Sequence, residues 1–170
     1  LEHALARADV VAAGPGLGAQ KPLVLDADAL NLLAYDPSAR DNWVLTPHPG
    51  EAARLLGTST EAIQRDRLDA VAQLQARYGG NVVLKGAGSL VQTHDAGGWL
   101  CDRGNPGMAT AGMGDVLTGV IAGIAAQCGD LSLAARAGVY VHAQAGDRAA
   151  ATGERGLVAG DVIAELRACV

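Results

Sequence analysis

The sequence contains no Phe, and aromatic residues make up only 3% of its 170 residues. This scarcity removes the stacking platforms on which single-strand nucleic-acid binders hold bases. Lys and Arg number 13 against 18 Asp and Glu, and they form no cluster. Such a chain lacks the basic surface that grips a phosphate backbone or an anionic membrane. We therefore expect neither nucleic acid nor a membrane as a partner.

Cysteine is also scarce, since Cys101, Cys128 and Cys169 are odd in number and form no CxxC pair. This pattern argues against a disulfide framework or a zinc ribbon, and it favours a reducing, cytoplasmic location. Three of the four histidines have no metal-ligand spacing to one another or to cysteine, so no protein-bound zinc is expected. No apolar run reaches the roughly 18 residues of a membrane-spanning helix.

Glycine, in contrast, is abundant, with 23 residues against an ordinary usage of about 7%. The glycines fall in clusters between short apolar runs, where they allow the backbone to approach a ligand closely. Hydrophobic residues make up 49% of the chain, which is enough for one well-buried core.

Short apolar runs that end in glycine or a polar residue alternate with helical patterns along the chain. This alternation predicts an α/β fold with a mostly parallel central sheet and helices on both faces. Ligands of such sheets bind beyond the carboxyl ends of the strands, where the glycine clusters fall. The predicted strands are 9–14, 23–26, 43–46, 81–85 and a hairpin over 90–98; the predicted helices include a single amphipathic one over 60–78, one from Asp115, and two more over 132–150 and 159–168.

The connection between the first two predicted strands is too short. Only seven residues, 15–21, separate them, whereas a parallel crossover needs a dozen or more. Either these two strands are not a parallel pair, or a connecting helix is absent from this chain. We favour the second explanation.

The strongest chemical signal is the glycine-rich segment 105–119. Gly112 and Gly114 let the backbone wrap a ligand, and the helix that follows points its first N–H groups into the loop. This arrangement suits a transferring phosphoryl group. Asp115 is placed either to accept a hydroxyl proton during phosphoryl transfer or simply to cap the helix, and spacing alone leaves both roles open.

Three other loops carry weaker signals. The GPGLG loop at 14–18 lacks the dinucleotide fingerprint, and no loop has the Walker pattern. His48 lies between two prolines, either as a ligand contact or as a surface histidine in a rigid turn. Lys85, after an apolar run, either neutralises a nucleotide phosphate or ends its strand at the solvent edge.

Several blocks, taken in order, resemble one family: GPGLG at 14–18, LVLDADALNLLA at 23–34, LTPHPGEAARLLG at 45–57, VVLKGAGSLV at 82–91, GNPGMATAGMGDVLTGVIAG at 104–123, and GVYVHAQAGD with GERGLVAGD at 138–147 and 153–161. Together they resemble the ADP- or ATP-dependent NAD(P)H-hydrate dehydratases, which are ribokinase-like enzymes of metabolite repair. Ribokinase-like vitamin kinases share only the GxGD part of this pattern.

The resemblance implies that a nucleotide phosphorylates the ring hydroxyl of hydrated NAD(P)H, called NAD(P)HX, and that phosphate then leaves. It implies that Asp115 is the base near this hydroxyl, and that Gly16, Gly18 and His48 contact the substrate. It further implies a binding site for ADP or ATP, with Mg²⁺ bridging the phosphates, formed by Lys85, Gly86, Ala87, Gly88 and Ser89 and by Ala111, Gly112, Met113 and Gly114.

Members of this family carry a further N-terminal segment that contributes to the sheet. We therefore expect residues 1–170 to be the carboxyl-terminal part of a single, incomplete ribokinase-like domain. We also expect a homo-oligomer and an NAD(P)HX epimerase domain or protein as a partner. Two alternatives stay open: a ribokinase-like kinase of a sugar or vitamin alcohol, and a nucleotide-binding module without catalytic activity.

Overall fold

The computed structural model describes residues 11–12, 21–95 and 97–170, so the predicted substrate contacts Gly16 and Gly18 lie outside the described residues. Strands β1 to β4 pair in parallel, and β5 and β6 add an antiparallel hairpin to the edge that β4 forms. This confirms the mostly parallel sheet. In the described residues the strands follow chain order: β1 (Val11–Ala12), β2 (Leu23–Leu25), β3 (Trp43–Leu45), β4 (Asn81–Leu84), β5 (Leu90–Thr93) and β6 (Gly97–Leu100).

The pairing of β1 with β2 excludes one of the two explanations for the short connection between these strands. Val11 pairs with Leu23 and Ala12 with Val24 in parallel register. The explanation that these strands are not a parallel pair is therefore wrong. Since a parallel crossover normally needs a dozen or more residues, an absent connecting helix remains our prediction.

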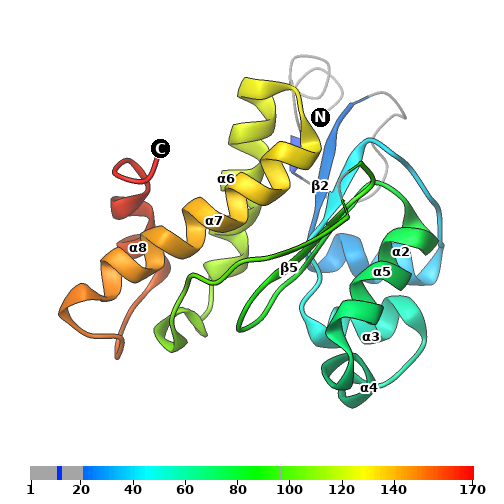
Figure 1. The fold of residues 1–170 in the computed structure, drawn as a ribbon, viewed down its shortest axis with the longest axis horizontal. Helices are drawn as coiled ribbons and strands as arrows, with labels where there is room; N and C mark the ends of the chain where they lie inside the picture. The colour runs from blue at the N-terminus through cyan, green and yellow to red at the C-terminus, as the bar shows by residue number, and fades with distance from the viewer. Residues whose placement is uncertain (1–10, 13–20, 96) are drawn as a thin grey trace.

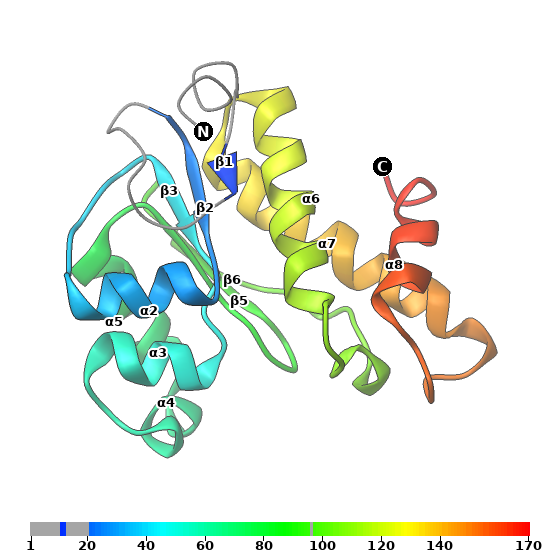
Figure 2. The same ribbon diagram turned by 180° about the vertical axis from the view of Figure 1, so that it is seen from behind.

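Helices cover both faces of the sheet, as Figures 1 and 2 show from opposite sides. One face carries α2 (Asp28–Tyr35), α3 (Pro49–Leu56), α4 (Thr60–Arg65) and α5 (Arg67–Tyr78). The other face carries α6 (Met113–Cys128) and α7 (Leu131–Ala149), and α8 (Ala159–Leu166) packs against α7. Two short 3₁₀ turns, Pro106–Met108 and Ala150–Thr152, complete the fold.

Alternate side chains along the strands divide the core into two layers, because successive residues of a strand point to opposite faces. Leu23 and Leu25 of β2 belong to the cluster under α2 to α5, whereas Val24 between them packs with α6 and α7. The uninterrupted apolar strands are thus explained by burial on both sides.

One predicted helix is wrong. Residues 60–78 form two helices and not one, because the chain breaks at Asp66. The backbone of Asp66 leaves the helical region at φ −143°, and its carboxylate accepts a hydrogen bond from the Asp69 amide, 3.0 Å away. An aspartate that caps a following helix in this way competes with continuation of the preceding one. The helix predicted from Asp115 begins two residues earlier, at Met113.

Close packing of α6 against α7 depends on Gly138. A Cβ at this position would lie 2.6 Å from Ile121 Cγ1, whereas a Cβ at Gly123 would have no described atom within 4 Å. We expect Gly138→Ala to lower the free energy of unfolding by about 1–3 kcal/mol through overpacking. Gly123→Ala should raise it by about 0.5–1 kcal/mol through helix propensity. Chemical denaturation of both variants tests this, and a loss of the same size in both would contradict it.

Candidate functional site

A cavity of about 530 Å³ lies beyond the carboxyl end of β4 and is large enough for a small ligand. Of the nine predicted nucleotide-binding residues, Lys85, Gly86, Ala87, Gly88, Ser89, Met113 and Gly114 line it; Ala111 and Gly112 precede α6 and lie outside the lining. The remaining walls come from Leu100 at the end of β6, from the loop that follows it (101–106, 108 and 109), from Leu117 of α6, and from Val139, His142 and Ala143 of α7.

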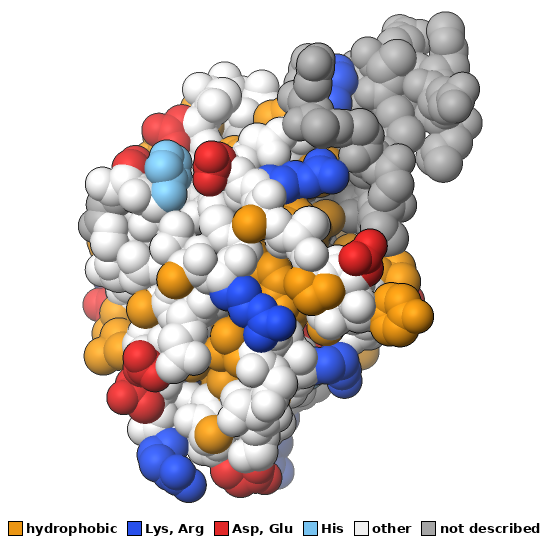
Figure 3. Space-filling view, turned by 90° about the vertical axis from the view of Figure 1, so that its right-hand side faces the viewer, with side chains coloured by type: hydrophobic (Ala, Val, Ile, Leu, Met, Phe, Trp, Pro, Cys, Tyr) orange, Lys and Arg blue, Asp and Glu red, His pale blue; other side chains and the backbone are white. Residues whose placement is uncertain are grey.

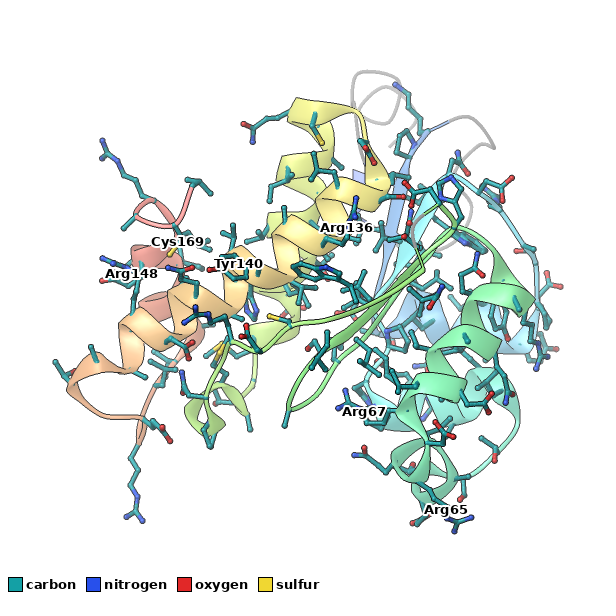
Figure 4. All side chains as sticks on the ribbon, in the orientation of Figure 1. Arg65, Arg67, Arg136, Tyr140, Arg148 and Cys169 are labelled. Atoms are coloured by element: carbon teal, nitrogen blue, oxygen red, sulfur yellow. The ribbon has the colours of Figure 1, made fainter. Side chains whose placement is uncertain are left out.

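The turn after β4 is held by an arginine that sequence reasoning missed. Arg67, at the start of α5 in Figure 4, donates from Nη1 to the Ala87 carbonyl at 2.6 Å and from Nη2 to the Leu84 carbonyl at 3.3 Å. A Cβ at Gly86 would lie only 3.0 Å from this guanidinium, and the φ of Gly86 is +149°. Burial lowers the pKa of Arg67. The cavity wall at this turn is therefore fixed from the opposite face of the sheet.

The start of α6 leaves backbone donors available beside the cavity. Gly112 occupies the N-cap position at φ +86°, with no side chain to satisfy the first amides of the helix. These amides and the positive end of the helix dipole suit an anion. Asp115 is exposed and lies at the third position of the helix, so the interpretation of Asp115 as the helix cap is wrong. Its role as a base stays a prediction.

A cluster of charged side chains lies next to this helix start. Lys85 Nζ is 2.6 Å from Asp26 Oδ1 and 3.9 Å from Glu51 Oε2, and the Lys85 side chain is only 19% exposed. Thr118 of α6 donates to Asp26 Oδ2 at 3.2 Å. The interpretation that Lys85 ends its strand at the solvent edge is therefore wrong. The sequence analysis did not identify Asp26 and Glu51 as site residues. Asp26 directly follows β2, and Glu51 lies in the first turn of α3, shortly after β3 ends.

Gly114 connects the charged cluster to the start of α6. A Cβ at Gly114 would lie 3.2 Å from Asp26 Oδ2 and 3.3 Å from Lys85 Nζ. A larger residue would push against this ion pair, which explains why glycine precedes Asp115. The structure thus brings together two predicted site residues, Lys85 and Gly114, and Asp115 is the next residue in the chain.

His48 caps α3. Its Nδ1 accepts hydrogen bonds from the amides of Gly50, at 3.0 Å, and Glu51, at 3.3 Å. In return, Glu51 Oε2 accepts from the His48 amide at 2.7 Å, which completes a capping box. The histidine is therefore fixed in a rigid turn, as expected, and its side chain remains 54% exposed. A contact with substrate stays a prediction.

The loop after β6 is anchored to α7 by Asp147. Its two carboxylate oxygens accept from the Gly104 amide and from Asn105 Nδ2, each at 3.0 Å. Asn105 Oδ1 in turn accepts from the Gly107 amide at 3.1 Å. This chain of hydrogen bonds holds the loop that forms one wall of the cavity.

His142 of α7 is a buried histidine in the cavity wall, with 8% of its surface exposed. Burial is the main cause that lowers the pKa of His142 to about 4; the nearby Lys85 charge lowers it further, and a hydrogen bond with the Met113 backbone raises it. The imidazole is therefore neutral at physiological pH.

Three further features of the described residues concern surface charge, metal-ligating side chains and membrane-spanning helices. On the face drawn in Figure 3, the Lys and Arg side chains are scattered among acidic and apolar ones. Within residues 11–12, 21–95 and 97–170, no group of three or more His, Cys, Asp or Glu side chains is arranged to hold a metal by itself. No helix in these same ranges has the length and apolarity needed to cross a membrane.

Comparisons with known proteins agree on one family. The sequence model of a family described as NAD(P)H-hydrate dehydratase matches residues 2–167. The bifunctional NAD(P)H-hydrate repair enzyme Nnr of Coxiella burnetii is 50% identical over 185 aligned positions, covering all of this chain and 38% of that protein. The ADP-dependent (S)-NAD(P)H-hydrate dehydratase of Neisseria meningitidis is 46% identical, covering 84% of this chain and 51% of that protein. The chain thus spans about half, or less, of the length of these relatives.

A solved structure shows the same fold. The ADP/ATP-dependent NAD(P)H-hydrate dehydratase of Bacillus subtilis, co-crystallised with ATP/Mg²⁺ and soaked with CoA, superposes with a TM-score of 0.81 at 27% identity. The match covers 98% of this chain and 69% of the Bacillus chain. The fold is therefore ribokinase-like, as the resemblance implied.

Proposed function

The chain belongs to the NAD(P)H-hydrate dehydratase family, and from this membership we propose that it acts in the ADP- or ATP-dependent dehydration of NAD(P)HX to NAD(P)H. The observation that carries the proposal is the position of Gly114. Gly114 lines the cavity at the start of α6, next to the Lys85 ammonium and to amides that no side chain caps, and Asp115 follows it directly in the sequence.

The proposed reaction has two steps. The ring hydroxyl of NAD(P)HX attacks the terminal phosphorus of the nucleotide, the bond to the departing nucleotide breaks, and Asp115 accepts the hydroxyl proton. Phosphate then leaves with the electron pair of the ring C–O bond, and loss of a proton from the neighbouring carbon restores the double bond. Phosphorylation suits this task because phosphate is a better leaving group than hydroxide.

The residues around Asp115 stabilise the transferring group. The first amides of α6 donate to the phosphoryl oxygens, where negative charge is concentrated during transfer. Lys85 neutralises phosphate charge, and Asp26 and Glu51 hold its ammonium in place. The turn over 85–89 contacts the nucleotide along the cavity.

The charged cluster also fits a magnesium ion. Asp26 and Glu51 carry two formal negative charges against the one positive charge of Lys85, and carboxylates together with nucleotide phosphates are typical Mg²⁺ ligands. We propose that these two carboxylates hold the ion. When bound, Mg²⁺ neutralises charge on the nucleotide phosphates.

The remaining expectations concern the substrate and the partners. We propose that His48 contacts NAD(P)HX through its exposed ring, together with Gly16 and Gly18. Because the Coxiella relative is a bifunctional repair enzyme, an NAD(P)HX epimerase is the proposed partner activity. A homo-oligomer and a cytoplasmic location are also proposed; the free thiols of the described residues, Cys101, Cys128 and Cys169, agree with a reducing compartment.

Absorbance spectroscopy tests the proposed function. The protein at its full natural length is incubated with hydrated NADH and either ADP or ATP. We expect the absorbance of NADH to grow only when nucleotide is present. A phosphorylated product that accumulates without NADH would instead indicate a small-molecule kinase. Tight nucleotide binding without any turnover would indicate a binding module.

A further inference from the structure

The carbonyl groups of the turn over 85–89 are occupied by an arginine that the proposed reaction does not use. Arg67 donates from Nη1 to the Ala87 carbonyl at 2.6 Å. Its Nη2 is 3.3 Å from the Leu84 carbonyl and 3.5 Å from the Lys85 carbonyl. The turn lines the cavity, whereas the Arg67 side chain does not. Any effect of this arginine on a ligand in the cavity must therefore pass through the turn.

The amides of the same turn are unpaired. In the part of the chain that the structure describes, the amides of Gly86 and Gly88 donate to no other residue. Both glycines line the cavity; Gly86 is exposed, and Gly88 is partly exposed. Their φ angles, +149° and +65°, lie in the region that favours glycine. A ligand in the cavity can therefore reach two backbone donors that have no partner in the protein.

The hydrogen bonds of Arg67 fix the direction of these amides. The peptide bonds of the described residues are trans, and in a planar trans peptide the carbonyl and the N–H that follows it point in opposite directions. The Leu84 carbonyl accepts from Arg67, and the amide that follows it donates on the opposite side, to the Pro47 carbonyl at 2.8 Å. Because the Ala87 carbonyl also points at Arg67, the Gly88 N–H points away from the guanidinium.

We propose that Arg67 is a positioning residue for the nucleotide: by holding the Ala87 carbonyl it directs the Gly88 amide into the cavity, where this amide donates to an acceptor atom of bound ADP or ATP. The inference rests on the proposed function, because it takes the cavity to be the nucleotide site. The hydrogen bonds of Arg67 all go to carbonyls over 84–87 and none to α6. Loss of the guanidinium should therefore weaken nucleotide binding and leave the phosphoryl transfer itself unchanged.

Calorimetry and steady-state kinetics on two matched variants test this role. The variants are Arg67→Met and, as a control, Arg65→Met, which replaces an exposed arginine at the end of α4 (Figure 4). In the protein at its full natural length, we expect Arg67→Met to raise the Kd for ADP about tenfold, the effect of one lost hydrogen bond. The kcat at saturating ADP should be unchanged, as for a residue that contributes only to binding. Arg65→Met should change neither quantity.

The variant Arg67→Lys separates positioning from charge. Lysine keeps the positive charge but lacks the planar fork with which arginine reaches several carbonyls at once. We expect Arg67→Lys to recover at most part of the ADP affinity that Arg67→Met loses. A lysine variant that binds ADP as tightly as the unaltered protein would show that the charge alone is responsible, and it would overturn the proposal.

The outcomes separate this inference from the proposed function. If the unaltered protein binds neither ADP nor ATP, the nucleotide site itself is wrong, and the inference fails with it. If the unaltered protein binds ADP but Arg67→Met binds it equally well, only the role of Arg67 is wrong. The same holds if Arg67→Met loses kcat while its Kd for ADP stays the same.

A second measurement needs no substitution and remains informative if Arg67→Met fails to fold. In protein labelled with ¹⁵N at glycine, the amide proton resonance of Gly88 should move downfield when ADP is added, because this amide gains an acceptor. The amide of Gly129, which donates to the Ala125 carbonyl at 2.9 Å at the far end of α6, should keep its resonance. A Gly88 resonance that ADP leaves unchanged would contradict the proposal.

Discussion

Replacing Asp115 with Asn is expected to reduce kcat by about 10³–10⁴-fold while leaving the affinity for ADP nearly unchanged. The amide has the same shape as the carboxylate but cannot accept the hydroxyl proton. Asp115 is exposed and makes no hydrogen bond with the described residues, so the fold should not depend on it. Steady-state turnover of hydrated NADH and calorimetric titration of ADP measure the two quantities.

Asp130→Asn is a matched control for this variant. Asp130 caps α7 just beyond the opposite end of α6, and asparagine is an equally good N-cap. We expect the control to keep kcat within about twofold, since it leaves the site intact. A near-normal rate in the Asp115 variant would remove Asp115 from the mechanism.

Replacing Lys85 with Met is expected to lower the free energy of unfolding by about 3 kcal/mol. Lys85 lies between the Asp26 and Glu51 carboxylates, whose side chains are only 12% and 8% exposed. Without the ammonium these charges are buried and uncompensated. The variant should also bind ADP more weakly, because it loses the cation expected at the phosphates. Urea denaturation measures the first effect and calorimetry the second.

The double variant Lys85→Met with Asp26→Asn isolates the charge effect. Removing one carboxylate should recover a large part of the lost stability, because less uncompensated charge remains buried. It should not recover nucleotide binding, which needs the cation. A double variant less stable than Lys85→Met alone would show that packing of the lysine stem, and not charge, is the cause.

The sequence was sufficient to predict the layered fold and the loops of the cavity. Four short apolar runs that end in glycine or a polar residue predict parallel strands, and the parallel pairing of β1 to β4 confirms them. Glycine clusters identified the turn over 85–89 and the start of α6, and both contribute residues to the wall of the cavity. These signals come from residues that are adjacent in the sequence, so the sequence alone is enough to detect them.

Contacts between distant parts of the chain could not be predicted in the same way. Asp26 and Lys85 are 59 residues apart, and they meet only because β2 and β4 end at the same edge of the sheet. The hydrogen bond from Arg67 to the turn after β4 depends on where α5 begins. The prediction of a single helix over 60–78 did not show that position. The capping box of His48 had a local signal, the glutamate three residues later, that could have been used.

A crystal structure of the protein at full length with bound ADP tests the central claim most directly. The account predicts the diphosphate against the first amides of α6 beside Lys85 and the nucleoside in the cavity between the 85–89 turn and α7. ADP bound elsewhere on the protein, with this cavity empty, would contradict it.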